Sequence, residues 1–92
     1  MRYVWDPAKD VLNQRKHGLS LAEGIPALED PQRDSWIDRR FDYGEERIVT
    51  LGMGRRQVLY VVSTEPAEDC TRIVSVRRAE EYEIERYGLG RS

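Results

Sequence analysis

Cysteine, histidine, lysine and long apolar runs are all scarce in this sequence. Its 92 residues include one cysteine, Cys70, so no disulfide forms within the chain, and we expect a reducing cytoplasmic location. No apolar stretch is long enough for a signal peptide or a transmembrane helix, so we expect no membrane role. His17 is the only histidine. This excludes a catalytic histidine pair within one chain, and we expect neither a metal site nor a cofactor.

Basic residues are not in excess, although nucleic-acid-binding domains usually show such an excess. The formal net charge is −2. Thirteen of the 15 basic residues are arginine, several of them in adjacent pairs: Arg39-Arg40, Arg55-Arg56 and Arg77-Arg78. A guanidinium holds two phosphate oxygens at once, which a lysine ammonium does not. The bias favours phosphate binding, but surface ion pairs explain it equally well.

The order of the expected elements predicts the fold class. No Pro/Gly/Ser-rich stretch divides the chain, so we expect one domain over residues 1–92, with residues 89–92 as a frayed tail. A strand at 3–5 is followed by a helix that begins after Asp6-Pro7 and ends at Gly18. Ser20 and Glu23 form a capping box that begins a second helix, which Pro26 shortens or kinks.

The second half of the chain is typical of strands. We expect a weak edge strand at 34–41 and clearer strands at 46–51, 57–64 and 71–77, then a closing helix at 79–87 that ends at Gly88. Short connections make antiparallel neighbours. The order β-α-α-β-β-β-β-α therefore predicts an α+β fold, an antiparallel sheet with its helices on one face. The other face would be free to form a groove.

Several short blocks, in this order along the chain, carry a family resemblance: Trp5-Asp6-Pro7-Ala8-Lys9, Lys16-His17-Gly18, Asp30-Pro31, Tyr43-Gly44-Glu45-Glu46-Arg47, and Arg72-Ile73-Val74-Ser75-Val76-Arg77 with Tyr87 beyond. Together they resemble the BrnT family of ribonuclease toxins over about residues 3–87. The resemblance implies a RelE-like fold, RNA cleavage that arrests translation, and neutralisation by a cognate antitoxin, BrnA. Operator DNA would be reached only through the antitoxin complex. The sequence departs from the family at Pro26, at Leu21 and in its acidic closing helix.

Cleaving RNA without a metal requires a base, an acid and cations on the phosphate. His17 titrates near neutral pH and suits proton transfer, whereas Lys16 suits phosphate. Both residues also lie at a helix C-terminus, where positive charge is favourable in itself. Glu46 and Arg47 occupy successive strand positions, so only one of them faces a given groove.

The strand at 71–77 offers two further arginines. Alternation places Arg77 on one face with Ile73 and Ser75, and Arg72 on the other face with Val74 and Val76. Polar Ser75 makes the Arg77 face the better phosphate groove. The structural alternative for both arginines is an ion pair with Glu83 or Glu80 on the closing helix.

The sequence thus predicts a metal-independent endoribonuclease without a cofactor. Its expected catalytic residues are His17, Glu46 and Arg77, and its expected RNA-phosphate contacts are Lys16, Arg47 and Arg72. Two alternatives remain open at this point: a non-catalytic antitoxin-binding co-repressor, and a plain RNA-binding domain.

Overall fold

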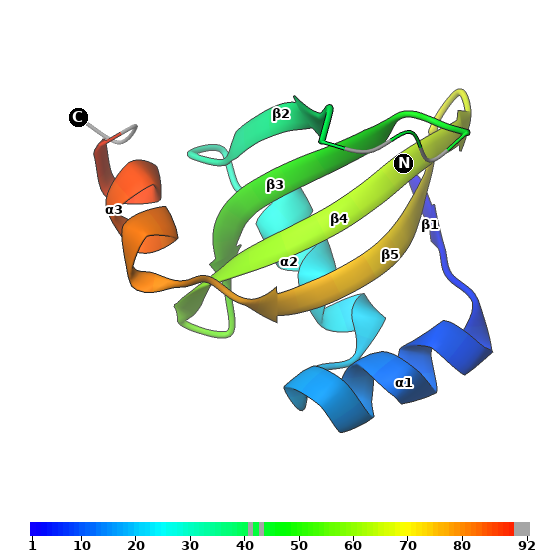
Figure 1. Ribbon diagram of the computed structural model, residues 1–92, viewed down its shortest axis with the longest axis horizontal. Helices are drawn as coiled ribbons and strands as arrows, with labels where there is room; N and C mark the ends of the chain where they lie inside the picture. Colours follow the sequence, from blue (N-terminus) through cyan, green and yellow to red (C-terminus); the bar gives the residue numbers. More distant parts are fainter. Residues whose placement is uncertain (41, 43, 90–92) are drawn as a thin grey trace.

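Five strands form one sheet in the order β1-β5-β4-β3-β2 (Figure 1). The computed structural model describes residues 1–40, 42 and 44–89. The strands are β1 (Arg2–Val4), β2 (Asp34–Asp38), β3 (Arg47–Gly54), β4 (Gln57–Ala67) and β5 (Cys70–Arg78). The last four form the expected antiparallel meander, but β1 pairs in parallel with β5. The sheet is therefore mixed, and not antiparallel throughout as the sequence predicted.

The first helix, α1 (Pro7–His17), begins and ends where the sequence indicated. Asp6 accepts a hydrogen bond from the backbone N–H of Ala8 at 2.9 Å, and Pro7 occupies the first turn, where its missing N–H costs nothing. Gly18 ends the helix in the left-handed region, at φ 72°, and its N–H donates to the Gln14 carbonyl. Among the residues described, no helix has the length and apolar character needed to cross a bilayer.

The expected second helix is broken into two pieces. A 3-10 turn, η1 (Leu21–Gly24), leads directly into the short helix α2 (Ile25–Leu28). The capping box is present, with the Glu23 carboxylate accepting from the Ser20 N–H at 2.5 Å. Pro26 lies in the first turn of α2, where a helix needs no backbone donor. The proline therefore marks the start of a new helix rather than a kink within one.

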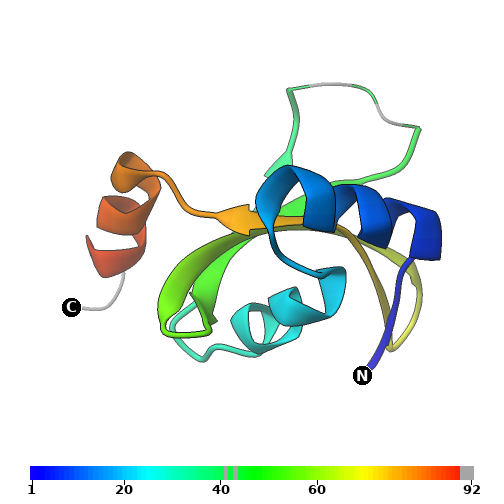
Figure 2. The same cartoon turned by 90° about the horizontal axis from the view of Figure 1, so that it is seen from below.

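Two apolar clusters cover the two faces of the sheet. The face covered by η1 and α2, here the inner face, carries Leu59, Val61, Ile73 and Val76, with Leu19, Leu21 and Ala27 packed on them and Trp5 partly buried beside them. On the opposite face, Tyr87 from the closing helix α3 (Glu81–Leu89) packs with Leu51 and Tyr60. Figure 2 shows α2 on one side of the sheet, with α3 beyond its end. The expectation that every helix lies on one face is wrong for α3.

Some element boundaries differ from the predicted ones. Strand β3 begins at Arg47, so Glu46 precedes the strand. Helix α3 starts two residues later than predicted and reaches Leu89. Gly88 therefore lies inside α3 and does not end it. The end of the strand predicted at 34–41, the Tyr43 position and the tail at 90–92 lie outside the described residues.

A β-bulge in β5 changes which arginines share a face. Val62 pairs with Ser75, but the next residue on β4, Ser63, pairs with Ile73, so Val74 is an extra residue without a partner on β4. The alternation of side chains between the two faces of the sheet therefore shifts by one residue at Val74. Arg72 pairs with Thr64 and Arg77 pairs with Tyr60, on the same side of β4.

The alternation expected from the sequence in β5 is consequently wrong. Arg72 lies on the same face as Arg77, whereas Ile73 and Val76 both point into the inner-face core. We call the face of Arg47, Arg72 and Arg77 the arginine face.

We expect Gly52→Ala to destabilise the fold, because α2 lies directly on the backbone of β3 at this glycine. A Cβ at Gly52 would lie 2.2 Å from the carbonyl oxygen of Ala27. Forcing extra volume into a packed core costs about 1–3 kcal/mol, and a backbone neighbour yields poorly. Urea unfolding measures this decrease in the free energy of unfolding. Gly88→Ala is the control, because a Cβ there meets nothing within 4 Å. Equal stability of both variants would contradict the close packing of α2 on β3.

Candidate active site

The side chain of Asn13 attaches α1 to the edge of β5. Its Nδ2 donates to the Val76 carbonyl at 2.8 Å and to the Leu19 carbonyl at 2.8 Å, while its Oδ1 accepts from the Val76 N–H at 3.1 Å. Strand β1 pairs with β5 only as far as Arg72, so Val76 has no strand neighbour on this side. Asn13 therefore fills the place of a neighbouring strand and fixes α1 alongside β5.

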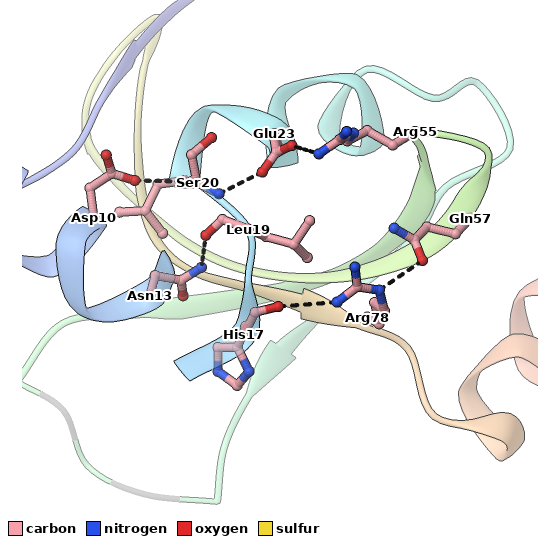
Figure 3. A network of polar contacts seen from close by, with 10 residues as sticks. Asp10, Asn13, His17, Leu19, Ser20, Glu23, Arg55, Gln57 and Arg78 are labelled. Carbon is pink, nitrogen blue, oxygen red and sulfur yellow. Dashed lines mark hydrogen bonds and ion pairs between the residues drawn. The ribbon is translucent and has the colours of Figure 1, made fainter. Parts of the chain in front are cut away.

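The backbone of His17 is held by a second contact at the end of α1. Arg78 donates from Nη1 to the His17 carbonyl and from Nε to the Gln57 side chain, both at 3.1 Å. Figure 3 shows this network, with the imidazole of His17 pointing away from it. Cations near the last carbonyls of a helix are favourable. The imidazole is thus free of the contacts that fix its backbone.

A hollow of about 190 Å³ lies between the end of α1 and β5. It is lined by His17 and Lys16 from the helix and by Ser75 from the strand, with Lys9, Leu12, Asn13 and Val74 completing its wall. Ser75 lies two residues before Arg77 on β5. Ser75 pairs with Val62 and Arg77 pairs with Tyr60, so both lie on the arginine face. The hollow therefore opens at the border between α1 and the arginine face.

Burial and positive neighbours lower the pKa of His17. Partial burial of the imidazole is the largest cause, followed by the charges of Lys16 and Arg77. Each of these disfavours the imidazolium form. Since the unperturbed pKa is 6.5, the His17 imidazole is mostly neutral at pH 7 and able to accept a proton.

Arg77 is fixed on the arginine face by two partners. Its Nη1 and Nη2 donate to the two carboxylate oxygens of Glu83 at 2.8 and 3.0 Å. Its guanidinium carbon lies 3.7 Å from the centre of the Tyr60 ring, a cation–π contact. The hydrogen bonds with Glu83 are the largest cause of a raised pKa at Arg77. The ion pair that the sequence offered as an alternative for Arg77 is therefore present.

Other arginines gather on the same face. Because Ile48 pairs with Ser63, the preceding residue Arg47 lies level with Thr64, which pairs with Arg72 on its other side. An Arg72 nitrogen lies 4.0 Å from a Glu45 carboxylate oxygen. The three predicted arginines thus lie on one face of the sheet, but none of them lines the His17 hollow.

Arg40 is a cation of this face that the sequence analysis did not assign to the site. It forms a bidentate pair with the buried Asp38 at 2.9 and 3.0 Å, and its Nη2 lies 3.4 Å from the Tyr60 hydroxyl. The paired arginines at 39–40 were a signal, but no pattern indicated that Arg40 and Arg77 would both contact Tyr60, one at its hydroxyl and the other over its ring.

Glu46 lies apart from His17. It lines a separate hollow of about 160 Å³ with Glu45, Thr64 and Glu65. Neither His17 nor Lys16 reaches this hollow. Within residues 1–40, 42 and 44–89, no group of three His, Cys, Asp or Glu side chains is placed to hold a metal ion. Of the two predicted proton-transfer groups, only His17 shares a hollow with a predicted phosphate contact.

The sequence matches a family model over residues 5–83, described as the ribonuclease toxin, BrnT, of type II toxin–antitoxin systems. The chain belongs to the BrnT family. A BrnT protein is a ribonuclease toxin with an antitoxin partner, so the family supplies both an RNA substrate and a protein partner.

A solved structure has the same fold as this BrnT-family chain. The crystal structure of the Brucella abortus ribonuclease toxin BrnT aligns with a TM-score of 0.65, covering 88% of this chain and 99% of that one. The two sequences are 20% identical, so this likeness supports the fold alone. A search of curated proteins found no match.

We expect Glu83→Gln to lower the free energy of unfolding by about 1–3 kcal/mol, because it leaves the Arg77 guanidinium without its carboxylate. Glu83 is 5% exposed. Burial alone would raise its pKa, but hydrogen bonds from Arg77 and from the Glu80 N–H outweigh burial and lower it below 4.5. The stabilisation is therefore complete above about pH 4.5 and is lost as pH falls through the lowered pKa.

Denaturant unfolding at a series of pH values tests this expectation. The difference between wild type and Glu83→Gln should be largest at neutral pH and shrink in acid. Glu81→Gln, an exposed carboxylate in the same turn of α3, is the matched control and should cost little. A pH-independent difference would mean that the charge of Glu83 contributes nothing.

Proposed function

We propose that this BrnT-family chain is a metal-independent endoribonuclease in which His17 is the general base and Lys16 and Arg77 stabilise the scissile phosphate. One observation supports this assignment above the others: His17 shares a hollow with Lys16 and Ser75, and the charges of Lys16 and Arg77 help to keep its imidazole neutral. A neutral imidazole beside cations is suited to removing a proton next to a negatively charged phosphate.

The proposed reaction begins with the ribose 2′-hydroxyl. His17 takes its proton, and the 2′-oxygen forms a bond to phosphorus while the bond from phosphorus to the 5′-oxygen breaks. Negative charge grows on the non-bridging oxygens, where Lys16 and Arg77 stabilise it. The leaving 5′-oxygen takes a proton from solvent. The products are a 2′,3′-cyclic phosphate and a 5′-hydroxyl.

The remaining predicted residues take supporting roles in this proposal. Arg47 and Arg72 share the arginine face with Arg77 and are assigned to neighbouring phosphates of the RNA. Glu46 receives no proton-transfer role, since its hollow holds three carboxylates and is separate from that of His17. Like charges around Glu46 would also repel the phosphate.

We further propose that cleavage arrests translation and that a BrnA-like antitoxin neutralises the toxin, with operator DNA reached only through their complex. Family membership supports an antitoxin partner. The second candidate function, a non-catalytic antitoxin-binding module, is favoured by one feature of α3, which exposes the apolar surfaces of Tyr82, Ile84 and Leu89. The two functions differ in whether the purified chain cuts RNA.

Cleavage of RNA by the purified chain in the presence of EDTA tests the proposal. We expect chelator-resistant cleavage, and His17→Ala should lower kcat about 10²- to 10⁴-fold, the usual contribution of a positioned base. The value of kcat/KM should rise with pH through a His17 pKa below 6.5 and level off near neutrality. Measured 5′-hydroxyl ends would identify the chemistry.

Two variants control this experiment. Arg56→Gln removes an exposed charge at the turn between β3 and β4 and should retain full activity. Glu46→Gln should also remain active. Loss of activity in Glu46→Gln with retention in His17→Ala would overturn the assignment of the base, and no cleavage at any concentration would favour the non-catalytic module.

A further inference from the structure

The hollow beside His17 continues as a groove along α1. A second hollow, of about 420 Å³, is lined by Trp5, Asp6 and Arg72 together with Val4 and Ile73. Lys9 and Val74 line both hollows. The two hollows therefore adjoin between α1 and β5, one toward the C-terminal end of α1 and the other toward its N-terminal end, and together we call them the α1 groove.

Three features of the fold create the α1 groove. Strand β1 ends at Val4, so it pairs with β5 no further than Arg72. Beyond that point Asn13 holds α1 to the strand edge through Val76. Between these two attachments lies Val74, the extra residue of the bulge, whose backbone has no partner on β4 in the register of the sheet. The groove passes over this unpaired position.

Positive charge is distributed along the α1 groove. Its two lysines, Lys9 and Lys16, are the only lysines in the sequence. They are seven residues apart, close to two helical turns, so they lie on the same side of α1 about 10 Å from each other. Arg72 adds a third cation at the far end.

Two carboxylates near the α1 groove accept hydrogen bonds from backbone N–H groups, and a third, Glu45, lies 4.0 Å from Arg72. Asp6, which lines the far end, accepts a hydrogen bond from the Ala8 N–H. Asp10, next to Lys9, is turned away and accepts from the Leu21 N–H at 2.7 Å. Lys9 is exposed and lies between the two hollows. Lys9, Lys16 and Arg72 are therefore spaced along the groove, with Lys9 where the two hollows adjoin.

We propose that the α1 groove binds an extended single strand of RNA beyond the scissile phosphate, with Lys9 and Arg72 each holding one backbone phosphate. This rests on the proposed function for the identity of the polymer. Cations spaced along a narrow groove track a phosphate backbone without reading its sequence. The hollow of about 190 Å³ lies at the His17 end of the groove, next to the scissile phosphate of the proposed reaction. Trp5 supplies apolar surface at the far end, and Val74 supplies it where the two hollows adjoin.

Binding of RNA oligonucleotides with 2′-O-methyl riboses tests the α1 groove, because such RNA lacks the attacking hydroxyl and is not cut. Fluorescence anisotropy is measured at several salt concentrations for an octamer and for a dinucleotide. For a single strand, each phosphate contact contributes about 0.7 to the slope of log affinity against log salt. We expect Lys9→Gln to weaken octamer binding and lower this slope by about 0.7, while dinucleotide binding stays unchanged.

Arg15→Gln is the matched control, because Arg15 is exposed on the same helix and lines neither hollow. It should leave octamer binding unchanged. The proposal is overturned if Lys9→Gln behaves like Arg15→Gln, if it weakens dinucleotide and octamer equally, if a base-paired octamer binds as tightly as the single strand, or if the wild-type chain binds neither probe. Lys9-dependent binding without cleavage of ordinary RNA would instead retain the groove and reject the proposed function.

Discussion

The paired hydrogen bonds between Asn13 and Val76 are the contact on which the site depends. A side-chain amide carries a donor and an acceptor in fixed geometry, so it matches the N–H and C=O of one residue on a strand edge. These groups would otherwise be unpaired where β1 has ended, and an unpaired buried backbone group is costly. Because Asn13 satisfies both, α1 lies beside β5 and directs its lysines along that edge.

The bulge at Val74 explains how an acidic chain presents a basic face. A regular strand would have separated Arg72 and Arg77 onto opposite faces. One extra residue brings both onto the arginine face with Arg47, while Ile73 and Val76 still reach the core. The net charge of −2 therefore gives little information about the site. Local geometry, rather than composition, therefore sets the charge of this face.

Local signals in the sequence were sufficient for the elements but not for their arrangement. Asp6-Pro7 and Gly18 defined α1, because helix ends depend on residues within a few positions. The parallel pairing of β1 joins residues 68 positions apart in sequence, and the pairs on either side of the bulge in β5 join residues 13 and 10 positions apart. No local sequence pattern indicates such pairings. The prediction that Arg72 and Arg77 lie on opposite faces of β5 was therefore wrong.

The same limit applies to the candidate site. His17 and Lys16 were found because the chain has one histidine and two lysines. Asn13 lies on the same helix, but its role depends on Val76, 63 residues further along the chain. Arg40 was missed because its place beside Tyr60 follows from the buried carboxylate of Asp38.

The contacts of Arg77 indicate how it and Lys16 divide their roles in the proposed reaction. Glu83 offsets much of the charge of Arg77 and, with the Tyr60 ring, holds its guanidinium in one orientation. A cation held in this way contributes mainly through its position, since little rearrangement is needed when phosphate charge develops. Lys16 is exposed and lines the His17 hollow. In the proposed reaction, the flexible lysine would supply charge that moves with the phosphate, and the fixed arginine would set where that phosphate lies relative to the base.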